Sequence, residues 1–486
     1  MIKTDVLIAG CGCAGLYCAM NLPRSLHILM VTKADLESSD SYLAQGGMCM
    51  LKDESDYQSY FEDTMRAGHE ENDRRSVEIM IRSSRPVVQD LISYGARFHR
   101  EPDGSLSFTR EGAHRHRRII YHEDVTGKEI TSSILEQVKK LPNVVMMEYT
   151  TLLDIIEDGS GECAGAVVRM KDGSIEKIAA QEVVLATGGI GGLYVHSTNF
   201  RQLTGDAVAI AIRHGMRLKN VNYIQIHPTT FYSPNKEDRS FLISESVRGE
   251  GAKLYDKHMH RFVNELLPRD LLTDAIYAQM AKDGTDFVWE DLRPIPEDQL
   301  REHFPNIVEH CREMGYDVTR ECIPVVPAQH YYMGGVWVDH ESRTSMHRLY
   351  TIGEAACNGV HGRNRLASNS LLESLVFARR AAHSMLADNS ALAAKSGLDA
   401  DTLKAYAQEN ADAPYTDEES CSESDRVRAV EDYAADGYQD AEALQREYAK
   451  LVKDEIRRAN SMMAPAQGND SSRLARTAFL EEAGNV

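Results

Sequence analysis

The first thirty residues combine short apolar runs with a glycine-rich turn. An apolar run at 5–9 leads into a turn with the pattern GxGxxG, which is followed by a stretch of helical spacing at 16–22 and a second apolar run at 27–32. Short apolar runs bounded by glycine are typical of buried strands. Strand, tight turn, helix and strand in this order predict a parallel βαβ unit, whose glycines let the backbone turn sharply and approach a pyrophosphate.

Further apolar runs predict that the sheet continues along the chain. A run at 182–187 breaks at glycines, a shorter one at 349–352 is followed by Gly-Glu, and apolar residues at 375–385 recur at helical spacing. The segment 361–374 before that helix is polar and rich in Arg, Asn and Ser. A strand end, a polar loop and a helix start can hold an anion, because exposed N–H groups and the helix dipole are positive there. The pattern predicts an α/β fold with a Rossmann-like dinucleotide-binding domain.

Composition and charge restrict the possible partners. The chain has 486 residues, of which 42% are hydrophobic and 26% charged, enough for two or three domains with a sizeable core. Its formal net charge of −20 argues against non-specific binding to nucleic acid or to an anionic membrane. The N-terminus leads directly into a strand and no apolar run is long enough to span a bilayer, so a cytoplasmic protein is expected. The nine cysteines lack metal-ligand spacing, and no metal site is expected.

The residue at the end of the second predicted strand distinguishes between cofactors. Nicotinamide enzymes usually have an acidic side chain there that accepts the ribose hydroxyls, whereas this chain has Lys33. A turn-rich segment at 41–47 follows, and the later strand that ends at Gly188 is typical of flavoproteins that contact their dinucleotide twice. The sequence therefore favours FAD over a nicotinamide cofactor.

A series of motifs in one order covers roughly four fifths of the chain. They are AQGG at 44–47, EDTxxAG at 62–68, DxTG at 124–127, ATGG at 186–189, TGD at 204–206, HPT at 227–229, RGEGA at 248–252, PRD at 268–270, GGV at 334–336, GEA at 353–355 and NRxASNSLLE at 364–373. With these motifs the chain resembles the succinate dehydrogenase and fumarate reductase flavoprotein family, most closely its aspartate-oxidising members.

The resemblance implies a split FAD-binding domain. Residues 1–234 and 330–391 are expected to form it, and the insertion 235–329 is expected to be an α+β capping domain that closes over the flavin. The segment 392–486 is expected to be helical. It is short and acidic and matches the family's three-helix C-terminal domain poorly, so no function is transferred to it.

The resemblance also implies a site for a C4 dicarboxylate over the flavin. His227 and His330 resemble the two histidines that hydrogen-bond a substrate carboxylate, with a structural role as the alternative. Arg365 resembles the arginine whose guanidinium forks onto a carboxylate. Ser244 stands where relatives often have Thr, and it keeps the hydroxyl.

One arginine resembles the family's proton-transfer residue. Arg269 lies in the PRD motif, where an ordinary ion pair with Asp270 at the surface is the alternative. Because arginine alone is a poor base, Arg269 needs a relay to pass the proton on. Arg248, Glu245 and Asp270 are the groups available for it.

The expected flavin contacts come from the same motifs. Glu354 should lie on the flavin side of the site. At a helix start, Asn369, Ser370 and the backbone of Leu371 should stabilise the negative charge of the reduced flavin. The remaining expected contacts are Gly10, Gly12, Ala14, Gly15, Lys33, Ser41, Ala44, Gln45, Gly46, Gly47, Ala186, Thr187, Gly188 and Asp206.

Two positions separate the aspartate-oxidising members from their relatives. Members with covalent flavin carry a His shortly before AQGG, where this chain has Asp40, so FAD is expected to be bound without a covalent link. The segment 110–119 resembles the EGGHSxxRI loop of the aspartate-oxidising members, although Ala113 and Arg115 depart from it. Glu111 in this loop is expected to bind the substrate ammonium, with a solvated acid paired to basic neighbours as the alternative.

The resemblance therefore implies FAD-dependent oxidation of L-aspartate to iminoaspartate, with oxygen or fumarate as acceptor, as the first step of de novo NAD biosynthesis. A soluble fumarate reductase or succinate dehydrogenase flavoprotein is the nearest alternative, and a flavin-binding subunit without turnover is a third. The physiological acceptor, the oligomeric state and the docking of a quinolinate synthase stay open at this point.

Overall fold

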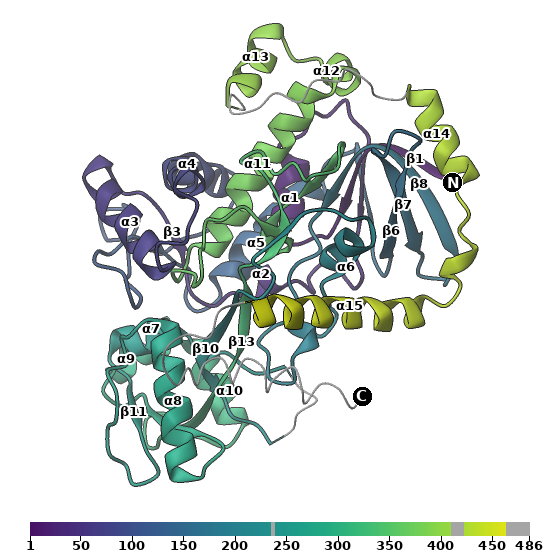
Figure 1. Ribbon diagram of the computed structural model, residues 1–486. Coiled ribbons are helices and arrows are strands. Elements are labelled where there is room, and N and C mark those ends of the chain that lie inside the picture. The colour runs from purple at the N-terminus through teal and green to yellow at the C-terminus, as the bar shows by residue number, and fades with distance from the viewer. Residues whose placement is uncertain (235–238, 410–421, 463–486) are drawn as a thin grey trace.

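A seven-stranded sheet forms the centre of the computed structural model, which describes residues 1–234, 239–409 and 422–462 (Figure 1). Its strands are β1 (Ile2–Ala9), β2 (Ile28–Val31), β5 (Val144–Met147), β6 (Thr151–Glu157), β7 (Cys163–Arg169), β8 (Ile175–Leu185) and β15 (Leu349–Thr351). The spatial order is β5-β2-β1-β8-β7-β6, and β15 also pairs with β8. All pairs are parallel except β8 with β7 and β7 with β6. These pairings confirm the predicted α/β fold with its Rossmann-like domain.

Helices cover one face of this sheet and form a large apolar core with it. They are α1 (Cys13–Met20), α4 (Arg74–Ser93), α5 (Thr126–Val138) and α11 (Ser370–Asp388). Leu16, Ile130 and Leu375 from these helices are buried in the same cluster as Val6 and Ile28 of the sheet. Because parallel strands are buried on both faces, their buried parts are continuously apolar, as observed for residues 6–9 of β1 and for β2.

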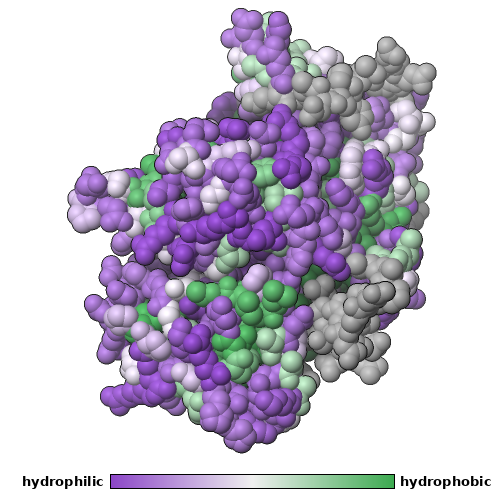
Figure 2. Space-filling model, turned by 60° about the vertical axis from the view of Figure 1, so that its left-hand side comes forward, coloured by the Kyte–Doolittle hydropathy of each residue, from purple (hydrophilic) through white to green (hydrophobic). Residues whose placement is uncertain are grey.

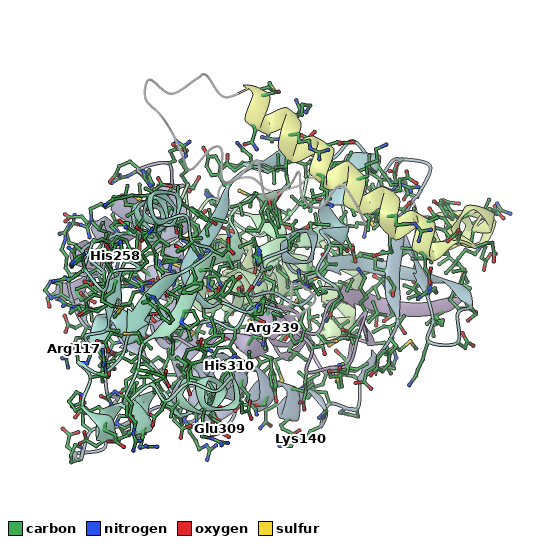
Figure 3. All side chains as sticks on the ribbon, turned by 90° about the horizontal axis from the view of Figure 1, so that it is seen from below. Arg117, Lys140, Arg239, His258, Glu309 and His310 are labelled. Atoms are coloured by element: carbon green, nitrogen blue, oxygen red, sulfur yellow. The ribbon has the colours of Figure 1, made fainter. Side chains whose placement is uncertain are left out.

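The C-terminal helices contribute to the opposite face. There α6 (Asp206–Arg213), α14 (Glu423–Asp432) and α15 (Ala441–Met462) pack on the strands. Along α15, Leu444, Tyr448, Val452 and Ile456 are buried at helical spacing. Seen from below, α15 crosses the molecule as one long helix (Figure 3). The predicted helical character of the C-terminal segment is confirmed for its described residues, while 410–421 and 463–486 lie outside them.

A second, smaller sheet with its own core stands beside the first. Its strands β10 (Ile224–Phe231), β11 (Lys253–Tyr255), β12 (Val288–Asp291) and β13 (Ile323–Tyr332) are antiparallel in the order β10-β13-β12-β11. They pack with α7 (Glu245–Glu250), α8 (Arg269–Asp283), α9 (Glu297–His303) and α10 (Pro305–Glu313). We call these strands and helices the cap; in Figure 1 it lies below the large sheet, and β10 and β13 lead into it. The boundaries 235–329 expected for a capping domain stay a prediction.

Short elements connect these units. They are α2 (Asp40–Leu43), β3 (Met48–Cys49), α3 (Glu54–Ala67), β4 (Ile119–Ile120), η1 (Gly191–Leu193), β9 (Leu218–Lys219), β14 (Gly335–Trp337), η2 (Gly353–Ala355), β16 (Ala356–Cys357), α12 (Ser390–Ser396), α13 (Ala400–Glu409) and η3 (Asp436–Tyr438). None of the helices in the described part of the chain has the length and apolar character that crossing a membrane requires. The face in Figure 2 is mostly hydrophilic, in keeping with the high content of charged residues.

The cap contains a buried carboxyl group with a strongly shifted pKa. Glu290 on β12 is completely buried, and neither of its carboxyl oxygens has a hydrogen-bond partner among the described residues. Burial raises its pKa from 4.5 to about 8. The folded protein therefore holds a proton on Glu290 at neutral pH that the unfolded chain releases, so this group makes folding less favourable as the pH rises from about 4.5 to 8.

We expect Glu290→Gln to remove that pH dependence. The amide keeps the shape but has no charge to bury, so the variant should gain stability over the parent by a few kcal/mol at pH 8 and by much less at pH 5. Urea unfolding at both pH values measures the difference. Glu302→Gln, at an exposed position of the neighbouring α9, is the matched control and should change little at either pH. An equal gain at both pH values would contradict the raised pKa of Glu290.

Candidate active site

One deep pocket lies where the large sheet meets the cap. It encloses about 1670 Å³ of empty space, open solvent at its mouth included. Its wall is built from the glycine turn after β1, the segment around α2, the ends of β8 and β15, the start of α11, and β10, α7, α8 and β13 of the cap. Ligands of open α/β sheets bind outside the carboxyl ends of the strands, which is where this pocket lies.

The glycine turn forms one end of the pocket. Gly10 has a φ of +125°, and a Cβ atom there would lie 2.0 Å from the carbonyl oxygen of Ala186. A Cβ at Gly15 would lie 2.1 Å from the carbonyl oxygen of Gly10, so this glycine lets α1 pack against the turn and does not line the pocket. The helix begins at Cys13, earlier than the predicted start at 16. Its N-terminus follows the glycine turn directly, where the pyrophosphate of a dinucleotide is expected to bind.

Lys33, which stands where nicotinamide enzymes usually have an acidic residue, is held in a network of polar contacts. Its ammonium lies 2.8 Å from Asp206 and also donates to Thr204 and to Gln445 of α15. Lys33 and Asp206 both line the pocket, so this ion pair forms part of its wall. The C-terminal helix thereby touches the cofactor side of the molecule.

Most other expected cofactor contacts line the same pocket. Those that line it are Gly12, Ala14, Ser41, Ala44, Gln45, Gly46, Gly47, Ala186, Thr187, Gly188, Glu354, Ser370 and Leu371. Asn369 does not line it: its side chain accepts a hydrogen bond from Tyr60 at 2.8 Å and donates to Thr64 at 3.3 Å. It ties α11 to α3 instead.

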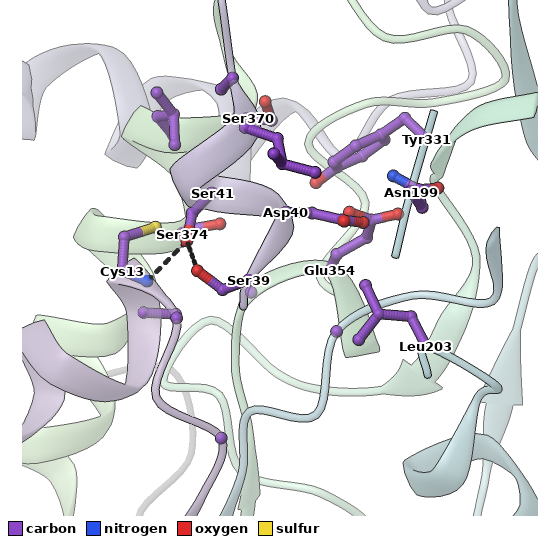
Figure 4. Close-up of a pocket in the computed structure, with 18 of the residues that line it drawn as sticks. Cys13, Ser39, Asp40, Ser41, Asn199, Leu203, Tyr331, Glu354, Ser370 and Ser374 are labelled. Carbon is purple, nitrogen blue, oxygen red and sulfur yellow. Dashed lines mark hydrogen bonds between the residues drawn. The ribbon is translucent and has the colours of Figure 1, made fainter. Parts of the chain in front are cut away.

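Two half-buried carboxyl groups, those of Asp40 and Glu354, lie close together in the pocket (Figure 4). Asp40 accepts from the backbone N–H of Phe200 at 3.0 Å, and Glu354 accepts from that of Tyr332 at 2.9 Å. Burial raises the pKa of Asp40 to about 7, and burial together with the charge of Asp40 raises the pKa of Glu354 well above its usual value. Asn199 and Tyr331 are drawn beside this pair in Figure 4.

Arg269 is part of a buried cluster and does not form a surface ion pair. Its side chain is 8% exposed, its Nε donates to Glu245 at 2.6 Å, and its Nη1 donates to Gln225 at 2.9 Å. Against the effect of burial, the charge of Arg269 lowers the pKa of Glu245. Asp270 faces elsewhere, toward His69 at 2.9 Å. The expected alternative of an Arg269–Asp270 pair is therefore not what the structure contains.

Arg365 faces the same cavity from the loop before α11. Its Nε donates to Gln225 at 3.2 Å, its Nη1 donates to Ser370, and its guanidinium lies 4.4 Å from the centroid of the Tyr331 ring. Burial and the nearby charge of Arg269 lower the pKa of Arg365 to about 10. The group stays cationic at neutral pH, so two positive charges lie close together and attract an anion between them.

The two expected histidines meet in the pocket wall. The rings of His227 on β10 and His330 on β13 are 5.1 Å apart in an edge-to-face arrangement. A register shift in the β10–β13 ladder follows His227. Burial, with the charge of Arg269 next, lowers the pKa of both well below the usual value, so both are neutral. Nε2 of His227 is buried without a hydrogen-bond partner, whereas Nδ1 of His330 contacts the Thr198 hydroxyl at 2.7 Å.

Glu111 is buried in the pocket wall and is not a solvated surface acid. One carboxyl oxygen accepts from the Ser246 hydroxyl at 2.8 Å and the other from the Ser368 hydroxyl at 2.6 Å. Burial and the charge of Glu245 raise its pKa. A Cβ atom at Gly46 would lie 2.7 Å from Glu111 Oε1, so the AQGG motif needs this glycine to make room for the carboxyl group. The expected alternative of a solvated acid is wrong.

Sequence reasoning missed several residues of this site. Gln225 accepts from both Arg269 and Arg365, and its amide N–H groups donate to Asn364 and to the carbonyl of Arg365. Ser368 and Ser246, which hold Glu111, were also not singled out. Gln225 and Ser368 lie within or directly beside motifs that the sequence did indicate, at 227–229 and 364–373, so proximity to those motifs is the signal that could have found them.

Ala113, which stands where the EGGHSxxRI loop has glycine, adopts a backbone conformation that costs free energy. Ala113 has a φ of +66°, in the left-handed region that glycine adopts readily and other residues adopt at a cost of about 1–2 kcal/mol. We expect Ala113→Gly to raise the free energy of unfolding by about 1 kcal/mol, which denaturant titration can measure. Ala405→Gly, at an exposed position inside α13, is the control and should lower it by about 0.5–1 kcal/mol. A loss of stability in the Ala113 variant would refute this account of the loop.

Comparisons with known proteins show the family to which the chain belongs. A family model described as an FAD binding domain matches residues 5–371. The chain is 49% identical to the L-aspartate oxidase of Clostridium perfringens over 378 residues, covering 78% of this chain and 85% of the relative. It is 41% identical to that of Neisseria meningitidis serogroup B, covering 80% and 79% of the two chains.

Solved structures with the same fold are also similar to it. A Mycobacterium smegmatis Sdh1 in complex with UQ1 is 28% identical, with a TM-score of 0.69 over 99% of this chain and 84% of that one. A quinol–fumarate reductase with menaquinol molecules is 26% identical, with a TM-score of 0.75 over 99% and 88%. Fold, pocket and family model together define a flavoprotein with an FAD-binding domain. Within that class, the chain belongs to the L-aspartate oxidase family.

Proposed function

We propose that the pocket holds FAD without a covalent link and oxidises L-aspartate to iminoaspartate. The observation that carries this proposal is the buried arrangement of Arg269, Arg365 and Glu111 around one cavity. Two guanidinium groups suit two carboxylates, and one carboxylate suits an ammonium group. L-aspartate has all three of these charges, whereas succinate lacks the ammonium that Glu111 would bind.

Several features of the chain suit FAD as the resident cofactor. The turn at Gly10 lets the backbone approach a pyrophosphate at the start of α1, and it lies within the residues that match the model of an FAD binding domain. Polar atoms that line the pocket, Gln45 Oε1 and Asp40 Oδ2 among them, are buried without a hydrogen-bond partner. Such atoms cost free energy unless a ligand satisfies them. When bound, FAD supplies the acceptor for a hydride from the substrate.

The substrate carboxylates would be held by charged and neutral donors. Arg365 is fixed by Gln225 and Ser370 and would fork onto one carboxylate. Nδ1 of His227 lies 3.2 Å from the backbone N of Thr229 and 2.9 Å from the carbonyl oxygen of the same residue. In the tautomer whose Nδ1 accepts the Thr229 N–H, the partnerless Nε2 carries the hydrogen and would donate it to a carboxylate. His330 and Ser244 line the same wall and would complete the clamp. The cap carries His227 and His330, and Ser244 directly precedes its helix α7, so we propose that the cap closes over the flavin and excludes water.

A proton must leave the substrate as the hydride leaves. Arg269 would accept it, because its guanidinium already shares a hydrogen with Glu245 at 2.6 Å and can hand a proton to that carboxylate. Arg248, also buried and on the same helix as Glu245, would pass it further. Oxidation of the amine to the imine releases one hydride and one proton: bound FAD would supply the hydride acceptor, and the Arg269–Glu245 pair would take the proton.

We expect the flavin to be released when the protein is denatured. Asp40 offers a carboxylate and no imidazole at the position where covalent-flavin relatives carry the linking histidine. After acid precipitation the yellow colour should therefore stay in the supernatant, with the absorbance spectrum of FAD. Colour that sediments with the denatured chain would contradict this prediction.

The electron acceptor is the part of the function that a single experiment can decide. Turnover of L-aspartate is measured anaerobically with and without fumarate, and then in air. We expect turnover in at least one of the two acceptor conditions and none anaerobically without fumarate. The iminoaspartate formed would feed quinolinate formation in NAD biosynthesis, and a quinolinate synthase is the partner that could receive it. Turnover of succinate without turnover of aspartate would favour the fumarate reductase or succinate dehydrogenase alternative.

A further inference from the structure

The serine that holds one oxygen of Glu111 is itself held in an unusual conformation. Ser368 has a φ of +63°, in the left-handed region, and its hydroxyl donates to Glu111 Oε2. Its carbonyl accepts from the backbone N–H of Cys49 at 2.9 Å. A serine pays a free-energy cost for this backbone conformation, so neighbouring contacts must stabilise it.

One of those contacts comes from a buried histidine of the Glu111 loop. His114 is 6% exposed, and its Nε2 lies 3.1 Å from the carbonyl oxygen of Ala367. This oxygen belongs to the peptide bond between Ala367 and Ser368. Nδ1 of His114 lies 3.0 Å from Nη1 of Arg118. Because a guanidinium can only donate, Nδ1 must be the acceptor and Nε2 must carry the hydrogen that is donated to Ala367. Burial, followed by the charge of Arg118, lowers the pKa of His114 to about 4, which is consistent with a neutral ring.

Arg118 is anchored firmly enough to set this tautomer. Its side chain is fully buried and donates to both carboxyl oxygens of Asp56, at 2.9 and 3.0 Å, and to Asp63 at 2.8 Å. Asp56 and Asp63 both belong to α3. A bidentate pair with a second carboxylate is among the strongest arrangements available to arginine, so the guanidinium that faces His114 has a fixed direction.

These contacts form a continuous path from α3 to the site. Arg118 orients His114, His114 fixes the Ala367–Ser368 peptide, and the Ser368 hydroxyl holds Glu111. We propose that His114 is a positioning residue which, by holding Ser368, aims the Glu111 carboxylate at the substrate ammonium and so sets the preference for aspartate. This inference rests on the proposed function, because it gives Glu111 the task of selecting the substrate.

The test compares two substitutions of His114 whose amide nitrogens take the places of different ring nitrogens. His114→Gln places an amide N–H near the position of Nε2 and can still donate to Ala367, whereas His114→Asn reaches only the position of Nδ1 and cannot. We expect His114→Asn to raise KM for L-aspartate about two- to tenfold, the effect of one lost hydrogen bond, with a small change in kcat and none in KM for fumarate. His114→Gln should recover most of the loss.

A matched control separates positioning from folding. His116→Asn makes the same change at an exposed position of the same loop and should leave both KM values and the melting temperature unchanged. Flavin content and melting temperature of each variant are measured alongside. If His114→Asn weakened aspartate and fumarate equally, or if His114→Gln were no better than His114→Asn, the positioning role would be overturned.

A double variant tests whether His114 acts through Glu111. In the Glu111→Gln background the added His114→Asn should change the ratio of kcat/KM for aspartate to that for fumarate less than twofold, because the carboxylate it aims is gone. A full, additive effect in that background would overturn the inference while leaving the proposed function standing. A single Glu111→Gln variant with an unchanged ratio would instead overturn the role of Glu111 in the proposed function, and this inference with it.

Discussion

Replacing Arg269 by lysine is expected to lower kcat for L-aspartate by about 10²- to 10⁴-fold, the usual contribution of general acid–base help. Lysine keeps the positive charge but has neither the reach nor the planar donors that let Arg269 contact Glu245 at 2.6 Å and Gln225 at 2.9 Å together. The connection through which a proton would leave is therefore cut, while the charge that attracts the substrate remains.

The binding of FAD and substrate should survive this change. Flavin content, measured from the absorbance of the purified enzyme, is expected to stay as in the parent, and KM for aspartate should change much less than kcat. Arg301→Lys is a suitable control, since that exposed arginine on α9 makes a comparable pair with Glu297 far from the pocket lining. A kcat close to that of the parent in Arg269→Lys would place the proton path elsewhere.

Replacing Glu111 by glutamine is expected to shift the preference from aspartate toward dicarboxylates without an ammonium group. A buried carboxylate beside that ammonium forms a charge-assisted hydrogen bond worth roughly 1.5–3 kcal/mol, or about ten- to a hundredfold in binding. Burial and the charge of Glu245 raise the pKa of Glu111 while the charge of Arg269 lowers it, and the arriving ammonium would add a second positive charge that favours the ionised form. Glutamine keeps the shape: its carbonyl oxygen can accept from one of the two serines that contact the carboxyl group, and its amide N–H can donate to the hydroxyl of the other.

The two substrates must respond in opposite directions for this account to hold. KM for aspartate should rise, repulsion of succinate and fumarate should be relieved, and flavin content should stay the same. Glu101→Gln, at an exposed position before the same loop, is the control and should alter neither substrate. An equal loss of aspartate and fumarate activity in Glu111→Gln would mean that the residue is structural.

Local patterns predicted the parts of the fold that depend on neighbouring residues. The turn at Gly10 and the strands around it follow from glycine spacing and short apolar runs, and the helical character of 441–462 follows from apolar residues every three or four positions. The predicted start of α1 at residue 16 is three residues too late, because the helix begins at Cys13, within the glycine turn pattern itself. Boundaries of this kind depend on backbone contacts that no spacing encodes.

The partners of the site residues could not be predicted in the same way. Asp270 is adjacent to Arg269 in sequence, yet Glu245 is the carboxylate that Arg269 contacts, because α7 and α8 bring residues 24 positions apart together. The contact between His114 and Ala367 joins residues 253 positions apart. Motif resemblance indicated most of the residues that line the pocket, with Gly15 and Asn369 as exceptions, but the packing of the cap against the large sheet determines which of them touch.

The most direct test of the central claim is anaerobic mixing of the purified, FAD-containing enzyme with L-aspartate in one sample and with succinate in another, followed by the flavin absorbance. The account predicts that L-aspartate bleaches the flavin with no other reductant present and that succinate leaves it oxidised. Bleaching by succinate and not by L-aspartate would contradict it.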